Sequence, residues 1–332
     1  MTVQVTILGL GQIGTSIGLA LGDHKDLVRR IGNDSEPNIA KRAEKIGAVD
    51  HIIFNLPSSV RQADLVILAV PVDEIREVLE TISTDLKEGA VIIDTSSTKE
   101  AAAKWAAELL PPERHFVAWT PTINPAYLHE TEFGIDAAQP DLFKDCLIFI
   151  TTPPGAAAPA IKLASDLTTL VGGKPFYADQ AEVDGLLAAN ILLPELTAAA
   201  LIHAVMDQPG WTEGRKLAGR SFALATSPIL GLEGNKAIAK AALANRENVV
   251  RVMDNLIAAL TNLRTAIQND NADGVQQQMQ EAREAREVWI GQRKINDWIS
   301  VDSPPSTLPT AGEVLGRLVG LRPKSTSKDR NK

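Results

Sequence analysis

The sequence has few features of secreted or membrane proteins. Its 332 residues include one cysteine, Cys146, so no disulfide can form within the chain. The N-terminus lacks a basic segment followed by an apolar segment and a small-residue cleavage site, and no uninterrupted run of about 18 apolar residues occurs. We therefore expect a cytoplasmic protein without a membrane-spanning segment.

Basic charge is also in deficit. Lys and Arg number 33 against 41 Asp and Glu, which gives a formal net charge of -8. Proteins that bind nucleic acid or anionic membranes through their surface usually carry an excess of basic residues. We expect neither as a partner, and a small-molecule substrate instead. The five histidines and Cys146 show no zinc-binding spacing, so no metal is predicted.

Two kinds of hydrophobic pattern divide the chain. Residues 1–178 alternate short apolar runs with helical patterns, which predicts a Rossmann-type, doubly wound parallel sheet covered on both faces. After residue 178 the strand patterns stop, and residues 179–300 are predicted to form an all-helical domain. The fold class is thus α/β followed by all-α. The predicted strands are Val3–Leu8, Leu27–Gly32, Leu65–Val70, Ala90–Asp94, Phe116–Trp119, Leu147–Thr151 and Pro175–Tyr177.

The predicted helical domain contains more apolar surface than one small bundle needs. Ala181–Met206 is almost uncharged and is predicted to be buried nearly all round, with Pro194 kinking or dividing it. Ala237–Asn269 and Gly274–Trp298 are long and amphipathic. We expect a homodimer formed through this domain. Residues 301–332 are predicted to be a proline-containing linker and a disordered basic tail.

A G-x-G-x-x-G motif lies between the first predicted strand and the first predicted helix. Its first glycine permits a tight turn, the second lets the backbone approach a pyrophosphate, and the third allows close packing of helix on strand. The helix N-terminus offers unpaired N–H groups to the phosphates. The predicted cofactor residues here are Gly9, Gly11, Gln12, Ile13 and Gly14.

An acidic residue follows the second strand at the spacing that this motif requires. Asp34 lies 20 positions after Gly14, where a carboxylate accepts hydrogen bonds from the adenine ribose hydroxyls. A carboxylate there repels a 2′-phosphate, which favours NAD over NADP. Arg29 and Arg30 lie within the strand and are less well placed to bind that phosphate.

Two further segments follow predicted strands at the same edge of the sheet. Val70 and Pro71 close the third strand and are expected to line the nicotinamide side of the cofactor site. The D-T-S-S-T-K segment after the fourth strand supplies Ser96 to the cofactor site and Ser97 to a substrate hydroxyl or carboxylate. Lys99 is predicted to pair with a substrate anion. The alternative is that these side chains only cap the following helix.

These motifs resemble the prephenate or arogenate dehydrogenase family of tyrosine biosynthesis. The resemblance extends over residues 3–298 and includes I-L-G-L-G-Q-I-G-T-S-I-G, A-V-P-V, D-T-S-S-T-K, Glu182-x-Asp184, Leu193-Pro194, Ser227-Pro228 and Asn245-Arg246. It implies an NAD-linked oxidative decarboxylation. A hydride leaves the ring carbinol for the nicotinamide, and loss of a carboxylate makes the ring aromatic.

The sequence departs from this family at the expected general base. Family members have a histidine before a proline after the fifth strand, whereas this chain has Thr120 before Pro121. Threonine has no pKa near neutrality, so it cannot act as the same base. We predict Ser97, Thr120 and Asn124 as catalytic polar contacts, with a water chain or His129 taking the proton.

The expected substrate pocket has also lost cations. The family's Ser-His-x-Pro-His segment reads Ile191-Leu192-Leu193-Pro194-Glu195 here, and an expected arginine before Ser227-Pro228 is missing. Arg220 lies nearby and is the predicted replacement. The predicted substrate-binding residues are Ser97, Lys99, Glu195 and Arg220.

Three functions remain open on the sequence. The first is a prephenate or arogenate dehydrogenase with a substituted catalytic site. The second is a dehydrogenase of the same scaffold that acts on a less charged hydroxy acid, which the apolar Val183 and Leu192 favour. The third is a catalytically weak, nucleotide-binding regulatory module.

Overall fold

The computed structural model describes residues 2–230, 234–296 and 298. Contacts divide the chain into two compact units, residues 1–282 and 283–332. The domain boundary predicted at residue 178 lies inside the first unit and stays a prediction. The predicted linker and basic tail at 301–332 lie outside the described residues.

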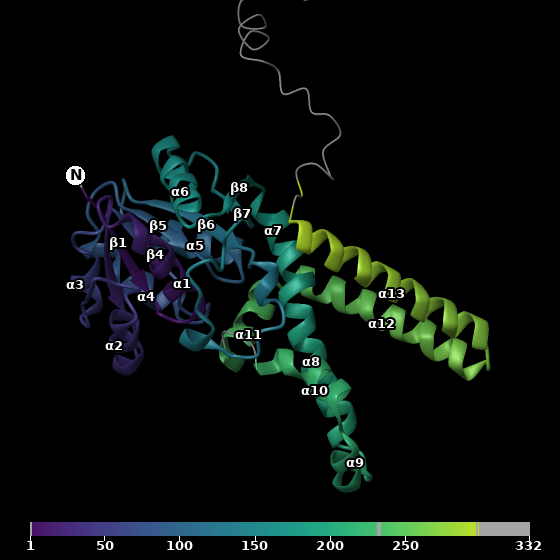
Figure 1. The fold of residues 1–332 in the computed structure, drawn as a ribbon. Helices are drawn as coiled ribbons and strands as arrows, with labels where there is room; N and C mark the ends of the chain where they lie inside the picture. Colours follow the sequence, from purple (N-terminus) through teal and green to yellow (C-terminus); the bar gives the residue numbers. More distant parts are fainter. Residues whose placement is uncertain (1, 231–233, 297, 299–332) are drawn as a thin grey trace, which may run out of the picture. The chain divides into compact units, whose positions relative to one another are not determined.

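In the described residues, eight strands form one sheet in the order β3-β2-β1-β4-β5-β6-β7-β8 (Figure 1). They are β1 Val3–Leu8, β2 Val28–Asn33, β3 His51–Ile52, β4 Leu65–Leu68, β5 Val91–Asp94, β6 His115–Pro121, β7 Leu147–Thr151 and β8 Lys174–Tyr177. All seven predicted strands are present, and the two-residue β3 was not predicted. The Rossmann-type fold is confirmed.

The sheet departs from the predicted parallel arrangement at one pair of strands. β7 is antiparallel to β6, although β8 is again parallel to β7. An apolar run indicates a strand but not its direction. The segment between β6 and β7 forms short 3₁₀ turns and no crossover α-helix, and a parallel connection normally needs such a crossover.

Helices cover both faces of the sheet. They are α1 Gln12–Ala20, α2 Pro37–Lys45, α3 Leu56–Val60, α4 Ile75–Ile82, α5 Lys99–Leu109 and α6 Ala158–Leu170. Successive strand residues point to opposite faces, so Ile93 packs in the cluster with α1 and α6 while Ile92 packs in the cluster with α4 and α5. The second cluster also includes residues of the helical region after β8.

The helical region is confirmed, but two predicted helices are interrupted. The described helices are α7 Gln180–Leu187, α8 Leu193–Met206, α9 Trp211–Leu217, α10 Arg220–Thr226, α11 Gly234–Ala244, α12 Arg246–Gln268 and α13 Ala272–Ile295. A π-helical turn, Ala188–Leu192, separates α7 from α8 just before Pro194, as the proline's missing N–H leads one to expect. The predicted helix 237–269 breaks at Asn245.

The expectation that residues 181–206 are buried nearly all round is wrong. In α8 only Ala198 is buried, and Ile191 and Met206 are 44% and 48% exposed. The segment 180–206 has the length and the mean hydropathy, 1.7, of a helix able to cross a bilayer, which core helices of other proteins also have, so the expectation of no membrane-spanning segment stays a prediction. Only 22% of its most apolar window is buried. The apolar composition of this segment indicates that its side chains are stable away from water, but it does not indicate which surface covers them.

Candidate functional site

The turn between β1 and α1 has the geometry that its outer glycines predict. Gly9 has φ +89°, and a Cβ there would lie 2.4 Å from the carbonyl oxygen of Ala69. A Cβ on Gly14 would lie 2.0 Å from the carbonyl oxygen of Gly9. Both positions therefore exclude side chains because the backbone of the turn is packed against β4 and α1.

Gly11 differs from these two glycines because its Cβ position is open. No heavy atom lies within 4 Å of that position, and Gly11 is the N-cap of α1 with φ -73°. Any residue can adopt this backbone, so the glycine is not needed for the turn itself. As the N-cap, Gly11 directly precedes the N–H groups at the start of α1, which is where a pyrophosphate would bind. The residues present therefore fit a dinucleotide.

The side chain of Gln12 is engaged by a hydrogen bond within the chain. The Gln12 side chain donates from Nε2 to the carbonyl oxygen of Ala137 at 3.1 Å, so it holds the segment between β6 and β7 against α1. Gln139 N donates to Ser16 Oγ at 2.9 Å in the same region. If Gln12 and Ile13 contact the cofactor as predicted, they would do so through their backbone N–H groups and not through the glutamine side-chain amide.

Asp34 lies against the glycine turn, and its predicted contact with the adenine ribose stays a prediction. Its Oδ2 accepts a hydrogen bond from Leu10 N at 2.7 Å, and its Oδ1 accepts one from Glu36 N at 2.8 Å. Arg30 is fully buried and pairs with Asp50 at 2.5 Å. It therefore cannot reach a 2′-phosphate beside Asp34, which supports the preference for NAD.

The predicted cofactor residues gather at the carboxyl edge of the sheet. Strand order reverses between β1 and β4, and nucleotides bind at such a switch point. Val70 and Pro71 directly follow β4, and Val70 N would lie 3.0 Å from a Cβ on Gly9. Asp34 follows β2 at the same edge.

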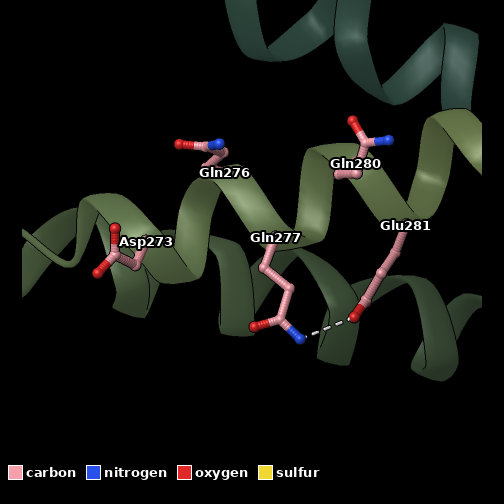
Figure 2. Close-up of a pocket in the computed structure, with 5 residues that line it drawn as sticks. All are labelled: Asp273, Gln276, Gln277, Gln280 and Glu281. Carbon is pink, nitrogen blue, oxygen red and sulfur yellow. Dashed lines mark hydrogen bonds between the residues drawn. The ribbon is translucent and has the colours of Figure 1, made fainter.

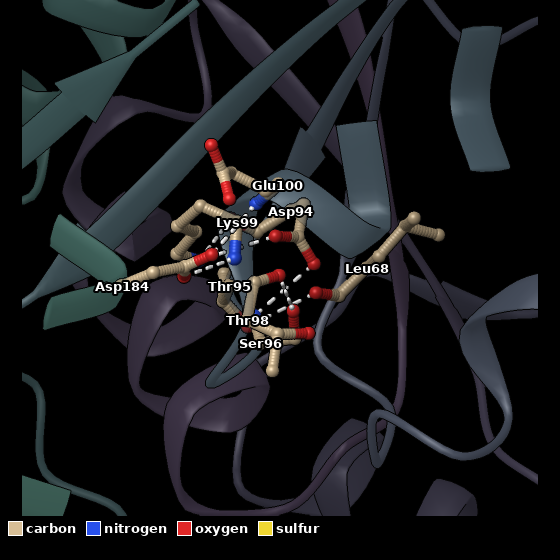
Figure 3. A network of polar contacts seen from close by, with 8 residues as sticks. All are labelled: Leu68, Asp94, Thr95, Ser96, Thr98, Lys99, Glu100 and Asp184. Atoms are coloured by element: carbon tan, nitrogen blue, oxygen red, sulfur yellow. Dashed lines mark hydrogen bonds and ion pairs between the residues drawn. The ribbon is translucent and has the colours of Figure 1, made fainter. Parts of the chain in front are cut away.

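The segment after β5, residues 94–99, is braced by its own side chains (Figure 3). We name it the 94–99 turn. Lys99 Nζ lies 3.1 Å from Asp94 Oδ2, and both side chains are fully buried. Ser96 N donates to Asp94 Oδ1 at 3.1 Å, and Ser96 Oγ donates to the carbonyl oxygen of Thr98 at 3.2 Å. Thr95 N and Oγ1 both donate to the carbonyl oxygen of Leu68 in β4.

This bracing changes the roles expected for two residues. Lys99 has an internal carboxylate partner and no exposed surface, so its burial argues against the predicted contact with a substrate anion. The hydroxyl of Ser96 is engaged within the turn, which leaves its backbone for the predicted cofactor contact. Ser97 lies between them, 7% exposed, and stays the predicted substrate contact.

Asp184 in α7 is a member of this site that sequence reasoning did not single out. Its Oδ1 accepts a hydrogen bond from Lys99 N at 2.6 Å, and its Oδ2 accepts one from Glu100 N at 3.0 Å. Burial raises the pKa of Asp184, although these N–H groups and the Lys99 ammonium oppose the shift. Because the folded-state pKa is raised, this carboxyl group favours folding at low pH and loses that contribution as pH rises through its folded pKa. The only sequence signal was the Glu182-x-Asp184 pair.

Thr120 points to the face of the sheet that carries α5. Its neighbour Trp119 packs on the other face, where its Nε1 donates to Thr168 Oγ1 at 2.8 Å. Ala118 pairs with Asp94, so the strand register brings the end of β6 beside the 94–99 turn. Thr120 Oγ1 is buried and has no hydrogen-bond partner among the described residues. A buried, unpaired hydroxyl is costly unless a ligand or water satisfies it.

The other catalytic candidates after β6 have different surroundings. Asn124 Oδ1 accepts from Ala126 N at 3.0 Å and its Nδ2 donates to the carbonyl oxygen of Asp141 at 3.2 Å, so both ends of the amide hold the local backbone. The Tyr127 hydroxyl donates to Asp141 at 2.5 Å, which raises the pKa of Tyr127 to about 12 and keeps it protonated. His129 is exposed.

The two remaining substrate candidates lie in the helical region. Glu195 is half-buried near the start of α8, directly after Pro194. Arg220 is exposed and is the first residue of α10. Their predicted substrate contacts stay predictions.

Two other features of the described residues give no site. No group of three or more His, Cys, Asp or Glu side chains that could hold a metal occurs among them. A hollow of about 320 Å³ lies along the start of α13, lined by Asp273, Gln276, Gln277, Gln280 and Glu281 (Figure 2). Gln277 Nε2 donates to Glu281 Oε1 at 2.9 Å. All five residues come from one helix, so no other element converges on the hollow.

Comparison with protein families identifies both halves of the first compact unit. Residues 17–177 match the family model described as prephenate dehydrogenase, nucleotide-binding domain. Residues 179–281 match prephenate dehydrogenase, dimerization domain. The glycine motif begins before the first matched residue, so its assignment depends on the geometry described above.

Among curated proteins, the chain is similar to the cyclohexadienyl dehydrogenase of Zymomonas mobilis. The two are 29% identical over 290 residues, which are 86% of this chain and 96% of that protein. It is 26% identical to the prephenate dehydrogenase of Bacillus subtilis over 86% of this chain and 76% of that protein.

The fold is similar to that of two solved structures. One is the prephenate dehydrogenase of A. aeolicus in complex with hydroxyphenyl propionate and NAD+, with a TM-score of 0.73, 22% identity, and coverage of 86% of this chain and 98% of that chain. The other is the arogenate dehydrogenase of Synechocystis, with a TM-score of 0.66, 21% identity, and coverage of 86% and 99%.

Proposed function

The chain belongs to the prephenate dehydrogenase family, and we propose that it oxidises prephenate or arogenate with NAD as the hydride acceptor. The observation that carries the proposal is the juxtaposition of a dinucleotide cradle with the 94–99 turn at one edge of the sheet. NAD, when bound, accepts the hydride from the ring carbinol, and loss of the carboxylate makes the ring aromatic.

The residues that would hold the cofactor come from three strand ends. The start of α1 at Gly11 offers backbone N–H groups to the pyrophosphate, and Gly9 and Gly14 keep this turn tight. Asp34 offers a carboxylate to the adenine ribose. Val70 and Pro71 would line the nicotinamide side.

We infer that two hydroxyls hold the substrate. We assign Ser97 to the substrate hydroxyl, and the unpaired Thr120 Oγ1 supports a second contact from the neighbouring strand. The burial and pairing of Lys99 and Asp94 favour a role in holding the 94–99 turn over a contact with the substrate. Arg220 stays our candidate for a substrate carboxylate. Asn124 is a weaker catalytic candidate because its amide is engaged by the backbone.

A turnover assay tests this function directly. Purified protein with NAD should produce NADH, followed by its absorbance, when prephenate or arogenate is added. Ser97→Ala should lower kcat about tenfold or more, because it removes a contact made to the reacting hydroxyl. Absence of NADH formation with either compound would contradict the function, and an unchanged rate in Ser97→Ala would remove Ser97 from it.

One observation favours a second candidate substrate. The positive charge of Lys99 is neutralised by Asp94, and Val183 and Leu192 are buried apolar residues where the family pattern has imidazoles. A desolvated dicarboxylate needs cationic partners. A less charged hydroxy acid would need fewer, so a panel of hydroxy acids belongs in the same assay.

We further propose that two copies associate through α12. Exposed apolar residues recur along it with coiled-coil spacing at Val250, Met253, Ile257, Leu260 and Ile267, where they are 36–61% exposed. The match to a dimerization domain supports a homodimer. Covering each half-exposed side chain stabilises the dimer by about 1 kcal/mol. Cytoplasmic location and the absence of nucleic-acid and membrane partners stay predictions.

Sedimentation equilibrium at micromolar concentration tests the dimer. Ile257→Glu places a charge in the centre of the exposed apolar row and should shift the dimer to monomer. Asn262→Glu adds the same charge on the opposite side of α12 and should leave the dimer intact. Equal behaviour of the two variants would show that this face is not the interface.

A further inference from the structure

We propose that Asp184 is a positioning residue: from α7 it fixes the start of α5 and so holds Ser97 in place for the substrate. The inference rests on the proposed function, because the placement of Ser97 matters only if a substrate binds there. Asp184 faces two backbone N–H groups, so it acts through the 94–99 turn and not on the reacting atoms.

The first support is that α5 lacks a cap from its own sequence. Helices usually begin with a Ser, Thr, Asp or Asn whose side chain accepts from the first turn. Thr98 occupies this position but makes no such bond, and its Oγ1 is buried without a partner among the described residues. The carboxylate of Asp184, 85 residues after Lys99, accepts from Lys99 N and Glu100 N instead.

The second support is that Asp184 is itself held by another helix. Its carbonyl oxygen accepts a hydrogen bond from Asn245 Nδ2 at 2.7 Å, and Asn245 Oδ1 accepts one from Asn248 Nδ2 at 2.9 Å. Asn245 lies between α11 and α12 and is the N-cap of α12. A continuous set of hydrogen bonds therefore runs from α12 through α7 to the first turn of α5.

The third support is that the 94–99 turn is held at its two ends by different parts of the chain (Figure 3). Asp94 and Lys99 fix it to the end of β5, within the nucleotide-binding half. Asp184 fixes its far end from the helical half. Ser97 lies between these two attachments, so we expect its backbone to become more mobile when the Asp184 attachment is lost.

The charge balance argues that this contact does more than stabilise the fold. Asp184 and Asp94 are both buried near one ammonium group, that of Lys99, and burial raises the pKa of Asp184. Burying a charged group is costly, whereas Thr98 offers a neutral hydroxyl at the position where α5 is normally capped. A carboxylate from a distant helix is the more costly solution, and what it adds is a link between the two halves.

The test combines amide exchange with kinetics on the full chain. In Asp184→Ala, amide hydrogen exchange in the peptide spanning residues 95–101 should become at least about tenfold faster, because two N–H groups lose their acceptor. The kcat should fall about tenfold or more while NAD affinity stays within about twofold of wild type. Asp184→Asn keeps one acceptor oxygen and should be intermediate in both measurements.

Asp64→Asn is the matched control. Asp64 Oδ2 accepts from Gln4 N at 2.7 Å at the amino edge of the sheet, away from the 94–99 turn. Its loss should lower thermal stability without changing kcat or exchange at residues 95–101. If Asp184→Ala does not fold, the exchange and kcat measurements on Asp184→Asn decide whether Asp184 positions the 94–99 turn.

Two results would separate this inference from the function it rests on. Wild-type kcat and wild-type exchange at residues 95–101 in Asp184→Asn would overturn the positioning role. A wild-type protein that oxidises neither prephenate nor arogenate would overturn the proposed function, while the exchange measurement would still decide whether Asp184 holds the turn.

Discussion

Replacing Thr120 with histidine is expected to raise kcat for prephenate or arogenate about 100-fold. A positioned general base typically contributes 10²–10⁴-fold, and threonine cannot supply one near neutral pH. Thr120 lies at the end of β6 on the face of α5, with an unpaired hydroxyl. An imidazole there would be directed toward the same region as Ser97. The measurement is steady-state NADH formation by wild type and Thr120→His.

The pH dependence makes this prediction specific. Thr120→His should add a rise in kcat/KM with pH that is centred near the ordinary histidine pKa of about 6.5, because only the neutral imidazole accepts a proton. Wild type should lack that rise between pH 6 and 8. Thr120→Gln has a similar size and no titration in this range, so it should show neither effect. Equal rates in the His and Gln variants would contradict the role assigned to this position.

Gly11→Ala is expected to weaken NAD binding about 100-fold with little loss of stability. The new methyl group meets no heavy atom within 4 Å, and φ of -73° suits alanine, so the fold should tolerate it. It would occupy the space that a pyrophosphate needs beside the N–H groups of α1. A 100-fold loss corresponds to about 2.7 kcal/mol of binding free energy. Calorimetric titration with NAD measures the loss, and thermal unfolding checks the fold.

Gly210→Ala is the matched control for this substitution. Gly210 also has no heavy atom within 4 Å of its Cβ position, its φ of -83° is again suited to alanine, and it precedes α9. It should change neither NAD affinity nor stability. Normal NAD affinity in Gly11→Ala would mean that the dinucleotide does not approach the start of α1. The redox function would then lose its basis.

The parts of the site made by local sequence could be predicted closely. The glycine spacing predicts a turn that the φ angle of Gly9 and the tight surroundings of Gly14 confirm. Asp34 directly follows β2, as the sequence predicts, and it accepts a hydrogen bond from Leu10 in the glycine turn. These features follow from a few neighbouring residues, because strand, turn and helix are each set by short-range sterics and hydrogen bonding.

The polar residues of the 94–99 turn could be found but not assigned roles. The sequence shows a lysine at the edge of the sheet. It does not show whether that lysine is exposed and able to bind an anion or, as Lys99 is, buried and paired with Asp94. Likewise, the sequence does not show that the surrounding backbone forms hydrogen bonds with the Asn124 amide and leaves the Thr120 hydroxyl without a partner among the described residues. Burial and pairing decide these roles, and both arise from residues distant in the chain.

By itself, the sequence predicted seven of the eight strands, the helical region after them, the dinucleotide motif, the family and the absence of the usual catalytic histidine. The tertiary structure alone decided that β7 runs antiparallel, that the apolar 181–206 segment is largely uncovered by its own chain, and that Asp184 caps α5. The physical reason is the range of the interactions. Periodicity and turn chemistry act within a few residues, whereas strand direction, burial and a cap from 85 residues away depend on how the whole chain packs.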